Sequence, residues 1–464
     1  MSFKVYGGVH PPAFKTTASD RPIRRVFIPK KVVLPLSQHT GSPAEPIVEV
    51  GQAVKVGDPV ARPSGHVSAA VHASLSGKVT KLEYMPTRIQ SRVLSVTIES
   101  QGNEDQEFKA SAPKDVAALS KEELLAIIKG AGIVGQGGAV FPTHVKLDPP
   151  KTKPVDTVIL NGTECEPCLT CDHRLMVERP NEILKGLDII MRVLGVKQAY
   201  IAIEDNKLAA IYAMERALEK AVIQLPKTKT QMAKAAGEFR LAGSVKIVVL
   251  KTKYPQGAEK QVVKAVLDRV VPAGGLPMDV GCVVQNVATA FSIYEAVYLS
   301  KPLIERVVTV TGSCIREPMN VWVRIGTMLT DVIGYAGGFV KEPAKVIVGG
   351  PMMGLAQYTM DIPVTKGFNG VIFLSRDEID RSQESVCIRC GKCVEICPMG
   401  LAPSTLMYRV KKELFAEADL LGLTNCYECG ACAYACPAKI PLLDYMKYGK
   451  SKIAVLSHGP GGRT

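Results

Sequence analysis

The chain has 464 residues and a formal net charge of +13, from 57 Lys and Arg against 44 Asp and Glu. Hydrophobic residues make up 47% and charged residues 22%, which excludes a disordered or collagen-like chain. Its apolar runs, such as residues 245–250, have the length of a strand, and its start lacks the apolar core of a signal peptide. We therefore expect a multidomain intracellular protein that is soluble or peripheral to a membrane.

The basic excess is concentrated in segments at the two ends of the chain and in a middle segment, residues 225–270, which holds ten Lys and Arg against three acids. Residues 1–35 hold seven Lys and Arg and one Asp, and the segment from Lys439 onward holds five and one. Neither segment has interleaved aromatic residues or a helix-turn-helix or RNA-binding signature, so we expect no nucleic-acid partner. We interpret the basic segments, residues 1–30 and 446–464, as docking features for acidic partners or a membrane face.

Residues 31–105 contain short β-branched runs separated by Gly and Pro, which predicts a small all-β domain. The pattern resembles the barrel-sandwich fold of lipoyl and biotinyl carrier domains. Where those domains carry a modified lysine at the tip, this chain has no lysine between His66 and His72. We therefore expect a structural or interaction role rather than a swinging arm.

Residues 115–275 alternate helical and strand patterns, which predicts an α/β domain with a mostly parallel sheet. Ser120 and Glu123 form a capping box ahead of the first apolar helical positions. That helix leads into a Gly-rich loop, and a β run follows at residues 155–162.

The Gly-rich loop contains Gly135, Gly137 and Gly138. It is not a dinucleotide fingerprint, because a helix precedes the loop and a strand follows it. Its backbone still permits close approach to a phosphate, with Lys146 as a countercharge. On chemistry alone, both a phosphate site and a simple tight turn remain open.

Residues 276–365 return to shorter apolar runs, which predicts a β-grasp-type insert, a small sheet with one helix. A further module is predicted at residues 370–445, where the cysteines crowd together.

Two segments of that module, Cys387–Pro398 and Cys426–Pro437, each read Cys-x2-Cys-x2-Cys-x3-Cys-Pro. This is the spacing of bacterial ferredoxins, in which the fourth cysteine ligates the other cluster. A pair of zinc sites would leave the fourth cysteine and the proline unexplained. We predict two [4Fe–4S] clusters, one held by Cys387, Cys390, Cys393 and Cys436, the other by Cys397, Cys426, Cys429 and Cys432.

Several segments together carry a family resemblance. GGAVFPTHVKL (137–147), NGTECEP (161–167) and QNVATA (285–290) resemble the flavin-binding region of the NADH-oxidising flavoprotein subunit of respiratory complex I. YPQGAEKQ (254–261), DHRLM (172–176) and VTVTG (308–312) resemble the C-subunit family of Rnf electron-transport complexes, as does the order of the four domains. The resemblance covers nearly the whole chain.

The resemblance implies a protein that binds FMN and exchanges electrons between NAD(H) and iron–sulfur clusters. No side chain is expected to act as acid or base, because the cofactor carries the chemistry. By motif position, the resemblance implies that FMN is lined by Gly135, Gly137, Gly138, Lys146, Asn161, Glu164, Gln285 and Asn286, and that Phe141 and Glu166 face the nicotinamide nucleotide.

The resemblance further implies a peripheral subunit on the cytoplasmic face of the cell membrane, within a ferredoxin:NAD⁺ oxidoreductase that moves Na⁺ or H⁺. Its expected partners are integral-membrane and ferredoxin-accepting subunits, with ferredoxin reached indirectly. Two alternatives stay open. One is a soluble cobalamin reductase of a propanediol-utilisation microcompartment, and the other is a non-catalytic electron-transfer scaffold.

Some positions depart from the family pattern. Val140 stands where the family usually has Gly, and Thr163 replaces an acid of the complex I flavoprotein. Three cysteines, Cys165, Cys168 and Cys171, form a further Cys-x2-Cys-x2-Cys series. A third metal site, redox-active thiols beside the flavin and buried free cysteines all remain open for this series.

Overall fold

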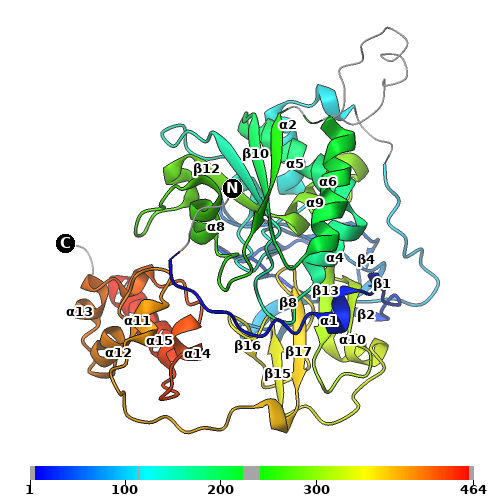
Figure 1. Ribbon diagram of the computed structural model, residues 1–464. Coiled ribbons are helices and arrows are strands. Elements are labelled where there is room, and N and C mark those ends of the chain that lie inside the picture. Colours follow the sequence, from blue (N-terminus) through cyan, green and yellow to red (C-terminus); the bar gives the residue numbers. More distant parts are fainter. Residues whose placement is uncertain (1–5, 112–114, 223–240, 242, 459–464) are drawn as a thin grey trace.

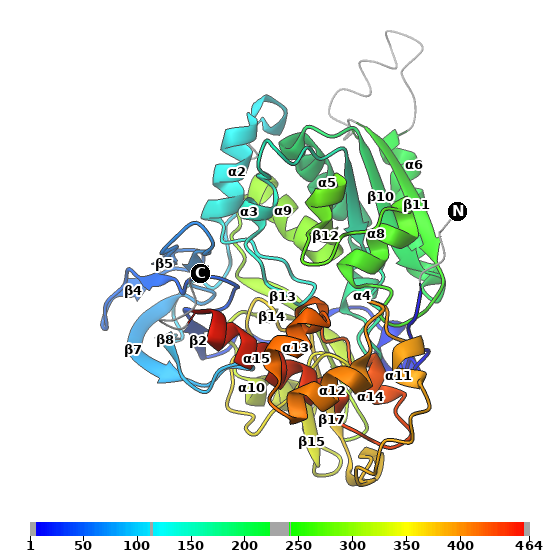
Figure 2. The ribbon, with the colours of Figure 1, turned by 90° about the vertical axis from the view of Figure 1, so that its left-hand side faces the viewer.

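The computed structural model describes residues 6–111, 115–222, 241 and 243–458 (Figure 1). It contains the four predicted units: a barrel-sandwich unit, an α/β unit, a unit built on a mixed sheet and a helical ferredoxin-type module. The predicted fold class is confirmed. In Figure 2 the ferredoxin-type module lies below the α/β unit, and the barrel-sandwich unit lies to one side of both.

The barrel-sandwich unit consists of two small antiparallel sheets. Residues 32–35 and 95–98 are buried on both faces of their strands, whereas none of residues 80–85 is buried. One sheet has the order β2 (Lys31–Pro35), β8 (Val93–Glu99), β7 (Gly77–Met85) and β4 (Ala53–Val54), and the other has β3 (Glu45–Pro46), β5 (Pro59–Arg62) and β6 (Val71–His72).

The α/β unit is built on a parallel sheet in which three of the four strands are mostly buried, as expected when helices cover both faces, whereas the edge strand at residues 244–250 is partly exposed. The capping box of Ser120 and Glu123 is present at the start of α2. The strand order is β11 (Ser244–Leu250), β10 (Gln198–Glu204), β9 (Thr157–Asn161) and β12 (Cys282–Asn286). The helices are α2 (Lys121–Gly130), α3 (Thr143–Lys146), α4 (Cys171–Glu178), α5 (Pro180–Leu194), α6 (Leu208–Val222), α8 (Glu259–Leu267) and α9 (Val287–Leu299).

The sheet places one domain boundary differently from our expectation. We expected the β-grasp insert to begin at residue 276, but β12 hydrogen-bonds to β9 along its whole length, and α9 then packs on α5. The α/β unit therefore extends to about residue 299, because strand pairing between distant segments decides which unit β12 joins.

Gly186 of α5 allows the close approach of α5 and α9. A Cβ at this position would lie 1.8 Å from the carbonyl oxygen of Ala290 in α9, and a backbone atom cannot rotate away. We expect Gly186→Ala to lower the free energy of unfolding by about 1–3 kcal/mol through overpacking, measured by urea denaturation.

Gly130→Ala is the matched control for Gly186→Ala. Gly130 is also helical, but a Cβ there would meet nothing within 4 Å. This variant should be neutral or more stable by up to about 1 kcal/mol, because Ala has the higher helix propensity. Equal stability of the two variants would contradict the close approach.

The third unit contains a six-stranded mixed sheet and one helix, α10 (Leu329–Tyr335). The sheet also contains strands from outside our expected range of 276–365: β1 lies in the predicted N-terminal segment, and β17 at the predicted start of the iron–sulfur module. The order is β1 (Arg24–Arg25), β14 (Met319–Arg324), β13 (Glu305–Thr311), β17 (Gly370–Leu374), β15 (Lys345–Val348) and β16 (Leu355–Ala356).

The N-terminal segment is a strap across the molecule, visible in dark blue in Figure 1. Val9 forms a β-bridge with Tyr254 of the α/β unit, and the Gly8 N–H donates to the Ile396 carbonyl of the ferredoxin-type module at 2.7 Å. The strap then forms α1 (Thr16–Ser19) and β1. Because its described part is built into the fold, our interpretation of residues 1–30 as a docking segment is wrong for residues 8–25.

The ferredoxin-type module is a set of short helices around a compact apolar core. We expected a basic tail from residue 446, but Met446 is fully buried in this core and the last helix runs on to His458. Residues 459–464 of that expected tail lie outside the described residues. The helices are α11 (Lys392–Glu395), α12 (Pro403–Lys411), α13 (Phe415–Leu420), α14 (Ala431–Tyr434) and α15 (Leu442–His458). Within the described residues, no helix has the length and apolar character needed to cross a membrane.

Candidate functional site

The predicted flavin residues meet at the carboxyl ends of two adjacent parallel strands. Asn161 ends β9 and Asn286 ends β12, and the two are paired across the sheet. The Gly-rich loop lies against them, since a Cβ on Gly137 would be 3.3 Å from the Cβ of Asn286. Open α/β sheets bind ligands at this edge. The structure thus brings the loop, Asn161 and Asn286 together, whereas Gln285 precedes Asn286 on β12 and its side chain points to the opposite face of the sheet.

The Gly-rich loop is fixed at its base and open at its tip. The Gly135 N–H donates to the Phe141 carbonyl at 2.9 Å, and the buried Gln136 amide donates to the Ala288 carbonyl at 3.1 Å. Gly137 and Gly138 are exposed, and Gly138 has φ +130°, which favours glycine. A Cβ on Gly138 would meet nothing within 4 Å, so there is free space beside the tip.

Val140, the departure from the family pattern, adopts φ +49°. This left-handed conformation is costly for a β-branched residue. Thr40 of the barrel-sandwich unit holds Val140 in this conformation. The Thr40 N–H donates to the Val140 carbonyl at 3.1 Å, and the Thr40 hydroxyl donates to the Ala139 carbonyl at 2.7 Å. The loop therefore keeps a conformation that suits glycine although valine occupies it.

Most polar side chains at this edge already have protein partners. The Asn161 amide donates to the Gly257 carbonyl at 2.8 Å, and Lys146 forms an ion pair with Glu259. Gln285 differs, because its Nε2 is buried and has no hydrogen-bond partner in the described part of the chain. The exposed backbone of the glycine loop fits the phosphate of a flavin, and the unpaired Gln285 amide leaves one donor on the same strand as Asn286 for a carbonyl of a ligand.

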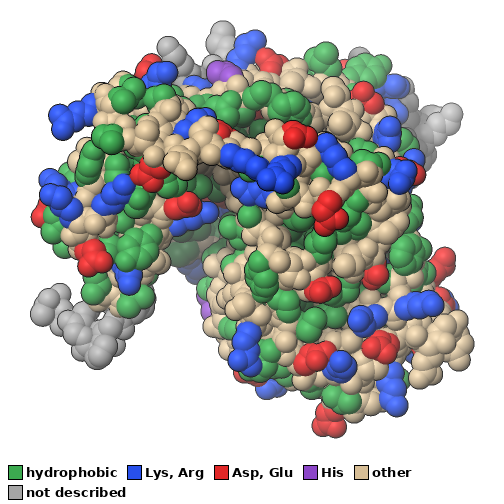
Figure 3. All heavy atoms as spheres, turned by 90° about the horizontal axis from the view of Figure 1, so that it is seen from below, with side chains coloured by type: hydrophobic (Ala, Val, Ile, Leu, Met, Phe, Trp, Pro, Cys, Tyr) green, Lys and Arg blue, Asp and Glu red, His purple; other side chains and the backbone are tan. Residues whose placement is uncertain are grey.

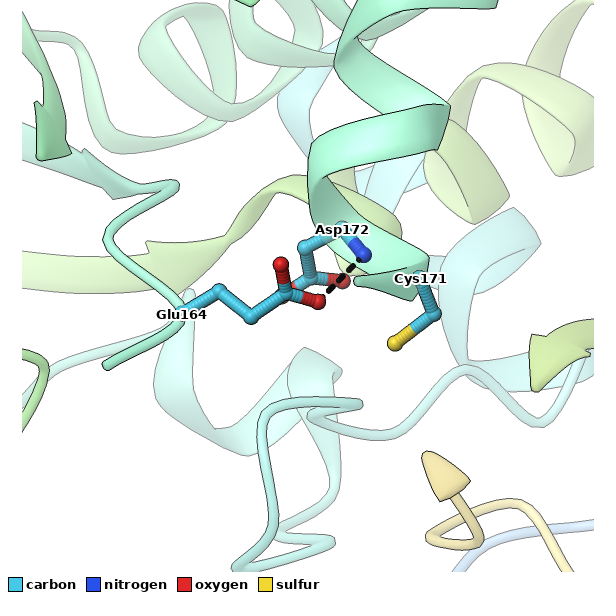
Figure 4. A group of neighbouring side chains, drawn as sticks. All are labelled: Glu164, Cys171 and Asp172. Carbon is cyan, nitrogen blue, oxygen red and sulfur yellow. Dashed lines mark hydrogen bonds between the residues drawn. The ribbon is translucent and has the colours of Figure 1, made fainter. Parts of the chain in front are cut away.

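Glu164 and Asp172 lie side by side at the start of α4 (Figure 4). The Glu164 carboxylate accepts hydrogen bonds from the N–H groups of Asp172 at 2.8 Å and His173 at 3.3 Å, so it caps the helix. Asp172 accepts a hydrogen bond from the Asn286 amide at 2.6 Å. Burial, and secondly the charge of Glu164, raise the pKa of Asp172 to about 7.

Cys171 lies next to this carboxylate pair. Its sulfur and the oxygens of Glu164 and Asp172 all lie within 4.8 Å of one another, the only such group of potential metal ligands among the described residues. The helix-capping hydrogen bonds of Glu164 explain the grouping without a metal ion. The three cysteines of the further series do not converge, because Cys165 and Cys171 belong to different apolar clusters.

Lys15 of the N-terminal strap is a site residue that sequence reasoning missed. Its buried ammonium donates to the carbonyls of Glu164 at 2.8 Å, Glu166 at 2.9 Å and Leu169 at 2.5 Å. Burial lowers the pKa of Lys15, and the Glu164 carboxylate opposes this from 4.0 Å. A single lysine in a basic segment carries no sequence signal for this role, which depends on contacts about 150 residues away.

We expect Lys15→Met to destabilise the chain by about 2–3 kcal/mol, because three buried carbonyls lose a charged donor. The loop that carries Glu164 should also loosen and bind FMN more weakly. Urea denaturation and the FMN retained after gel filtration measure the two effects. Lys31→Met is the control, since Lys31 is exposed and has no ion pair among the described residues. Equal stability and FMN content in the two variants would contradict this role of Lys15.

Glu166 turns away from the Gly-rich loop toward the mixed-sheet unit. Its carboxylate accepts hydrogen bonds from the N–H groups of Met352 at 3.1 Å and Met353 at 2.8 Å. Burial raises the pKa of Glu166 to about 7, and these two hydrogen bonds oppose the shift. Phe141, the other residue expected at the nicotinamide, is half-buried at the base of the Gly-rich loop. Among the described residues, Glu166 and Phe141 therefore have different hydrogen-bond partners, and no hydrogen bond joins them.

The second predicted cysteine set converges in the ferredoxin-type module. Cys397, Cys426, Cys429 and Cys432 line one small apolar cavity. Burial, and then the neighbouring thiols Cys429, Cys426 and Cys397, raise the pKa of Cys432 to about 12. Backbone N–H groups point at two of the sulfurs, from Leu401 to Cys397 and from Glu428 to Cys426, each at 3.4 Å. Such amide contacts orient and tune thiolate ligands.

The two cysteine motifs repeat one backbone conformation. Arg389 and Glu428 have φ values of +55° and +61°, and the following glycines, Gly391 and Gly430, have +75° and +77°. Among the described residues, no three cysteine sulfurs lie within 4.8 Å of one another. A tetrahedral zinc ion with Zn–S bonds of about 2.3 Å needs sulfurs about 3.8 Å apart. The described cysteines therefore do not form a preorganised zinc site.

Family models match all four units. The Nuo51 FMN-binding domain matches residues 128–295, and the RnfC barrel sandwich hybrid domain matches residues 3–103. The SLBB domain matches residues 307–356, and the 4Fe-4S dicluster domain matches residues 386–440. A solved NAD⁺-reducing [NiFe]-hydrogenase aligns over 75% of this chain and 63% of that chain, at 18% identity and a TM-score of 0.48, too low to support an argument.

Curated relatives match almost the full chain. The C subunit of the proton-translocating ferredoxin:NAD(+) oxidoreductase complex of Clostridium ljungdahlii is 44% identical over 96% of this chain and 93% of its own length. The C subunit of the Na(+)-translocating complex of Acetobacterium woodii is 41% identical over 89% of this chain and 88% of its own length. The C subunit of the ion-translocating oxidoreductase complex of Rhodobacter capsulatus is 40% identical over 98% of this chain and 84% of its own length. The chain belongs to the C-subunit family of the ion-translocating (Rnf) oxidoreductase complexes.

Proposed function

We propose that this chain transfers electrons between NAD(H) and iron–sulfur clusters by way of FMN, as the C subunit of an ion-translocating ferredoxin:NAD⁺ oxidoreductase complex. FMN would supply the conversion of a two-electron hydride into single electrons, which [4Fe–4S] clusters carry. The relatives named as such complexes, the matched FMN-binding domain and the matched dicluster domain support this function.

One observation carries the proposal: the α/β unit is packed directly on the second cysteine motif. The Tyr254 hydroxyl donates to the carbonyl of Cys429 at 2.6 Å, in a buried contact. Cys165, which is two residues before the end of the NGTECEP segment, packs in the same apolar cluster as Tyr254 and Cys429. Cysteines that would hold a cluster thus lie next to the segment that follows Asn161 and Glu164.

The chain's own residues would hold the groups as follows. The exposed backbone of Gly137 and Gly138 would face the FMN phosphate, and the unpaired Gln285 amide would donate to a carbonyl of the ligand. Lys15 would keep the loop that carries Glu164 in place through its hydrogen bonds to the backbone carbonyls of that loop. The two cluster sets would be those read from the sequence, Cys387, Cys390, Cys393 and Cys436, and Cys397, Cys426, Cys429 and Cys432.

We further propose a peripheral position on the cytoplasmic face of the membrane, in contact with integral-membrane subunits of the complex and with a subunit that accepts electrons from ferredoxin. The names of the relatives support membership of a complex that translocates ions. A cobalamin reductase is less well supported, since three relatives at 40–44% identity carry names of translocating complexes.

Iron and flavin contents of the anaerobically purified chain test the proposal. We expect about eight iron atoms per chain, as two cubanes require, and one FMN. Fractionation of native cells should recover the chain in washed membranes together with partner subunits. A chain without FMN, or with iron for a single site, would contradict the proposed function.

A further inference from the structure

The ferredoxin-type module presents one cysteine set to the rest of the chain. Its contacts with other units cluster around Cys397 and Cys429. The Gln261 amide donates to the Pro398 carbonyl at 3.0 Å, and a Cβ on Gly430 would be 2.9 Å from the Met352 carbonyl. Together with the Tyr254 hydrogen bond, these contacts make the set of Cys397, Cys426, Cys429 and Cys432 the inner set.

The other cysteine set is turned outward. Cys390 is exposed, whereas Cys429, at the same position of the second motif, is buried. The residues around Cys390 include large apolar side chains that are mostly exposed: Val386 is 84% exposed and Ile388 is 67% exposed. Because the two motifs share one backbone conformation, their different exposure reflects which motif the other units cover.

The charges beside this apolar surface that have no ion-pair partner are mainly basic, because the nearby acids are paired with lysines. Asp380 pairs with Lys439 at 2.7 Å, and Glu384 pairs with Lys411 at 3.0 Å. Three exposed cations, Arg381, Arg389 and Lys392, have no ion-pair partner among the described residues, against one exposed acid of α11, Glu395. In Figure 3 the module, on the left, shows Lys and Arg side chains interspersed with hydrophobic and acidic ones.

We propose that this outer face, formed by Val386, Ile388 and Cys390 with the cations Arg381, Arg389 and Lys392, is the docking surface of an acidic electron-carrier domain, that of the partner subunit which accepts electrons from ferredoxin. Docking interfaces combine an apolar centre with a charged rim, and complementary charge speeds encounter. An apolar pair directly beside an exposed cluster ligand, with unpaired cations around it, has this composition. The inference rests on the proposed function, because it assumes that a cluster is bound at the outer set.

The order of the two sets follows from the same contacts. The inner set faces the flavin-type unit, and the outer set faces the carrier. An electron arriving from the carrier would therefore enter at the outer set and leave toward the flavin-type unit past Cys429 and Tyr254. The carrier itself would make no contact with the α/β unit.

A small acidic bacterial ferredoxin, reduced chemically, is the probe for the outer face, where it stands in for the acidic carrier domain of the partner subunit. Stopped-flow absorption gives the second-order rate constant for reduction of the full holoprotein. We expect Ile388→Asp to lower it at least tenfold, and the double variant Arg389→Glu, Lys392→Glu to lower it at low ionic strength and flatten its salt dependence. Leu420→Asp is the control, since Leu420 is 89% exposed on α13, a helix that packs on α12 and α15. It should stay within twofold of the unaltered chain.

An unchanged rate in Ile388→Asp, or an equal loss in Leu420→Asp, would overturn the docking surface. So would a charge-reversed variant that loses binding to phosphatidylglycerol vesicles but keeps the ferredoxin rate, since the face would then contact lipid. Iron content and flavin reduction by NADH are measured in each variant. If these fail in the unaltered chain, the proposed function fails. If only the ferredoxin rates disagree, the docking surface alone fails.

Discussion

Replacing Cys429 with alanine is expected to remove the inner cluster and stop ferredoxin-driven NADH formation by the assembled complex, while NADH still reduces the flavin. Cys429 is buried in the inner set, and the Tyr254 hydroxyl binds its carbonyl. Iron should fall from about eight toward about four atoms per chain, because a cubane needs its thiolate ligands. The flavin site should be intact, since its residues lie in the α/β unit.

Cys314→Ser is the matched control for this variant. Cys314 is also buried, but it lies in the mixed-sheet unit, within reach of the Glu342 carbonyl, which a serine hydroxyl can also use. This variant should keep its iron and its ferredoxin-driven NADH formation. Full NADH formation in a Cys429→Ala protein that has lost half its iron would show that electrons do not pass through the inner set.

Gly138→Ala is the second change with a large expected effect. Gly138 has φ +130°, where side chains cost about 1–3 kcal/mol, and a Cβ would project into the free space at the tip of the Gly-rich loop. We expect FMN affinity to fall at least about tenfold, corresponding to about 1.4 kcal/mol. Fluorescence titration of the flavin-free chain with FMN measures the change.

Gly102→Ala separates strain from flavin binding. Gly102 has φ +93° and equally free space, but it lies in the linker after the barrel-sandwich unit. Both variants should lose similar stability in urea, and only Gly138→Ala should lose FMN. If both bind FMN like the unaltered chain, the tip of the Gly-rich loop is not part of the flavin site.

Local patterns were sufficient to predict much of the fold. Ser120 caps α2 through its own neighbour three residues on, and the two cysteine motifs fold the same way because their spacing dictates a shared turn at Gly391 and Gly430. Domain membership that depends on distant pairing was not predictable in this way. β12 joins the α/β unit by pairing with β9, and β1 joins the mixed sheet through β14.

The same distinction applies to the site. The resemblance assigned the Gly-rich loop and Asn286 to one flavin site, and the structure places the two in contact at one edge of the sheet. It gave no indication that Lys15 would reach the loop after β9, because that contact depends on the path of the strap. The expectation of free basic ends was wrong for the strap, whose Arg24 and Arg25 pair with Glu317 and Glu305.

Anaerobic titration of the purified, FMN-loaded chain with NADH tests the central claim most directly. The account predicts that NADH bleaches the flavin absorption stoichiometrically, because the Gly-rich loop and the strand ends of β9 and β12 would hold FMN within reach of the nucleotide. A flavin that stays oxidised in excess NADH would contradict the account and favour an electron-transfer scaffold without nucleotide chemistry.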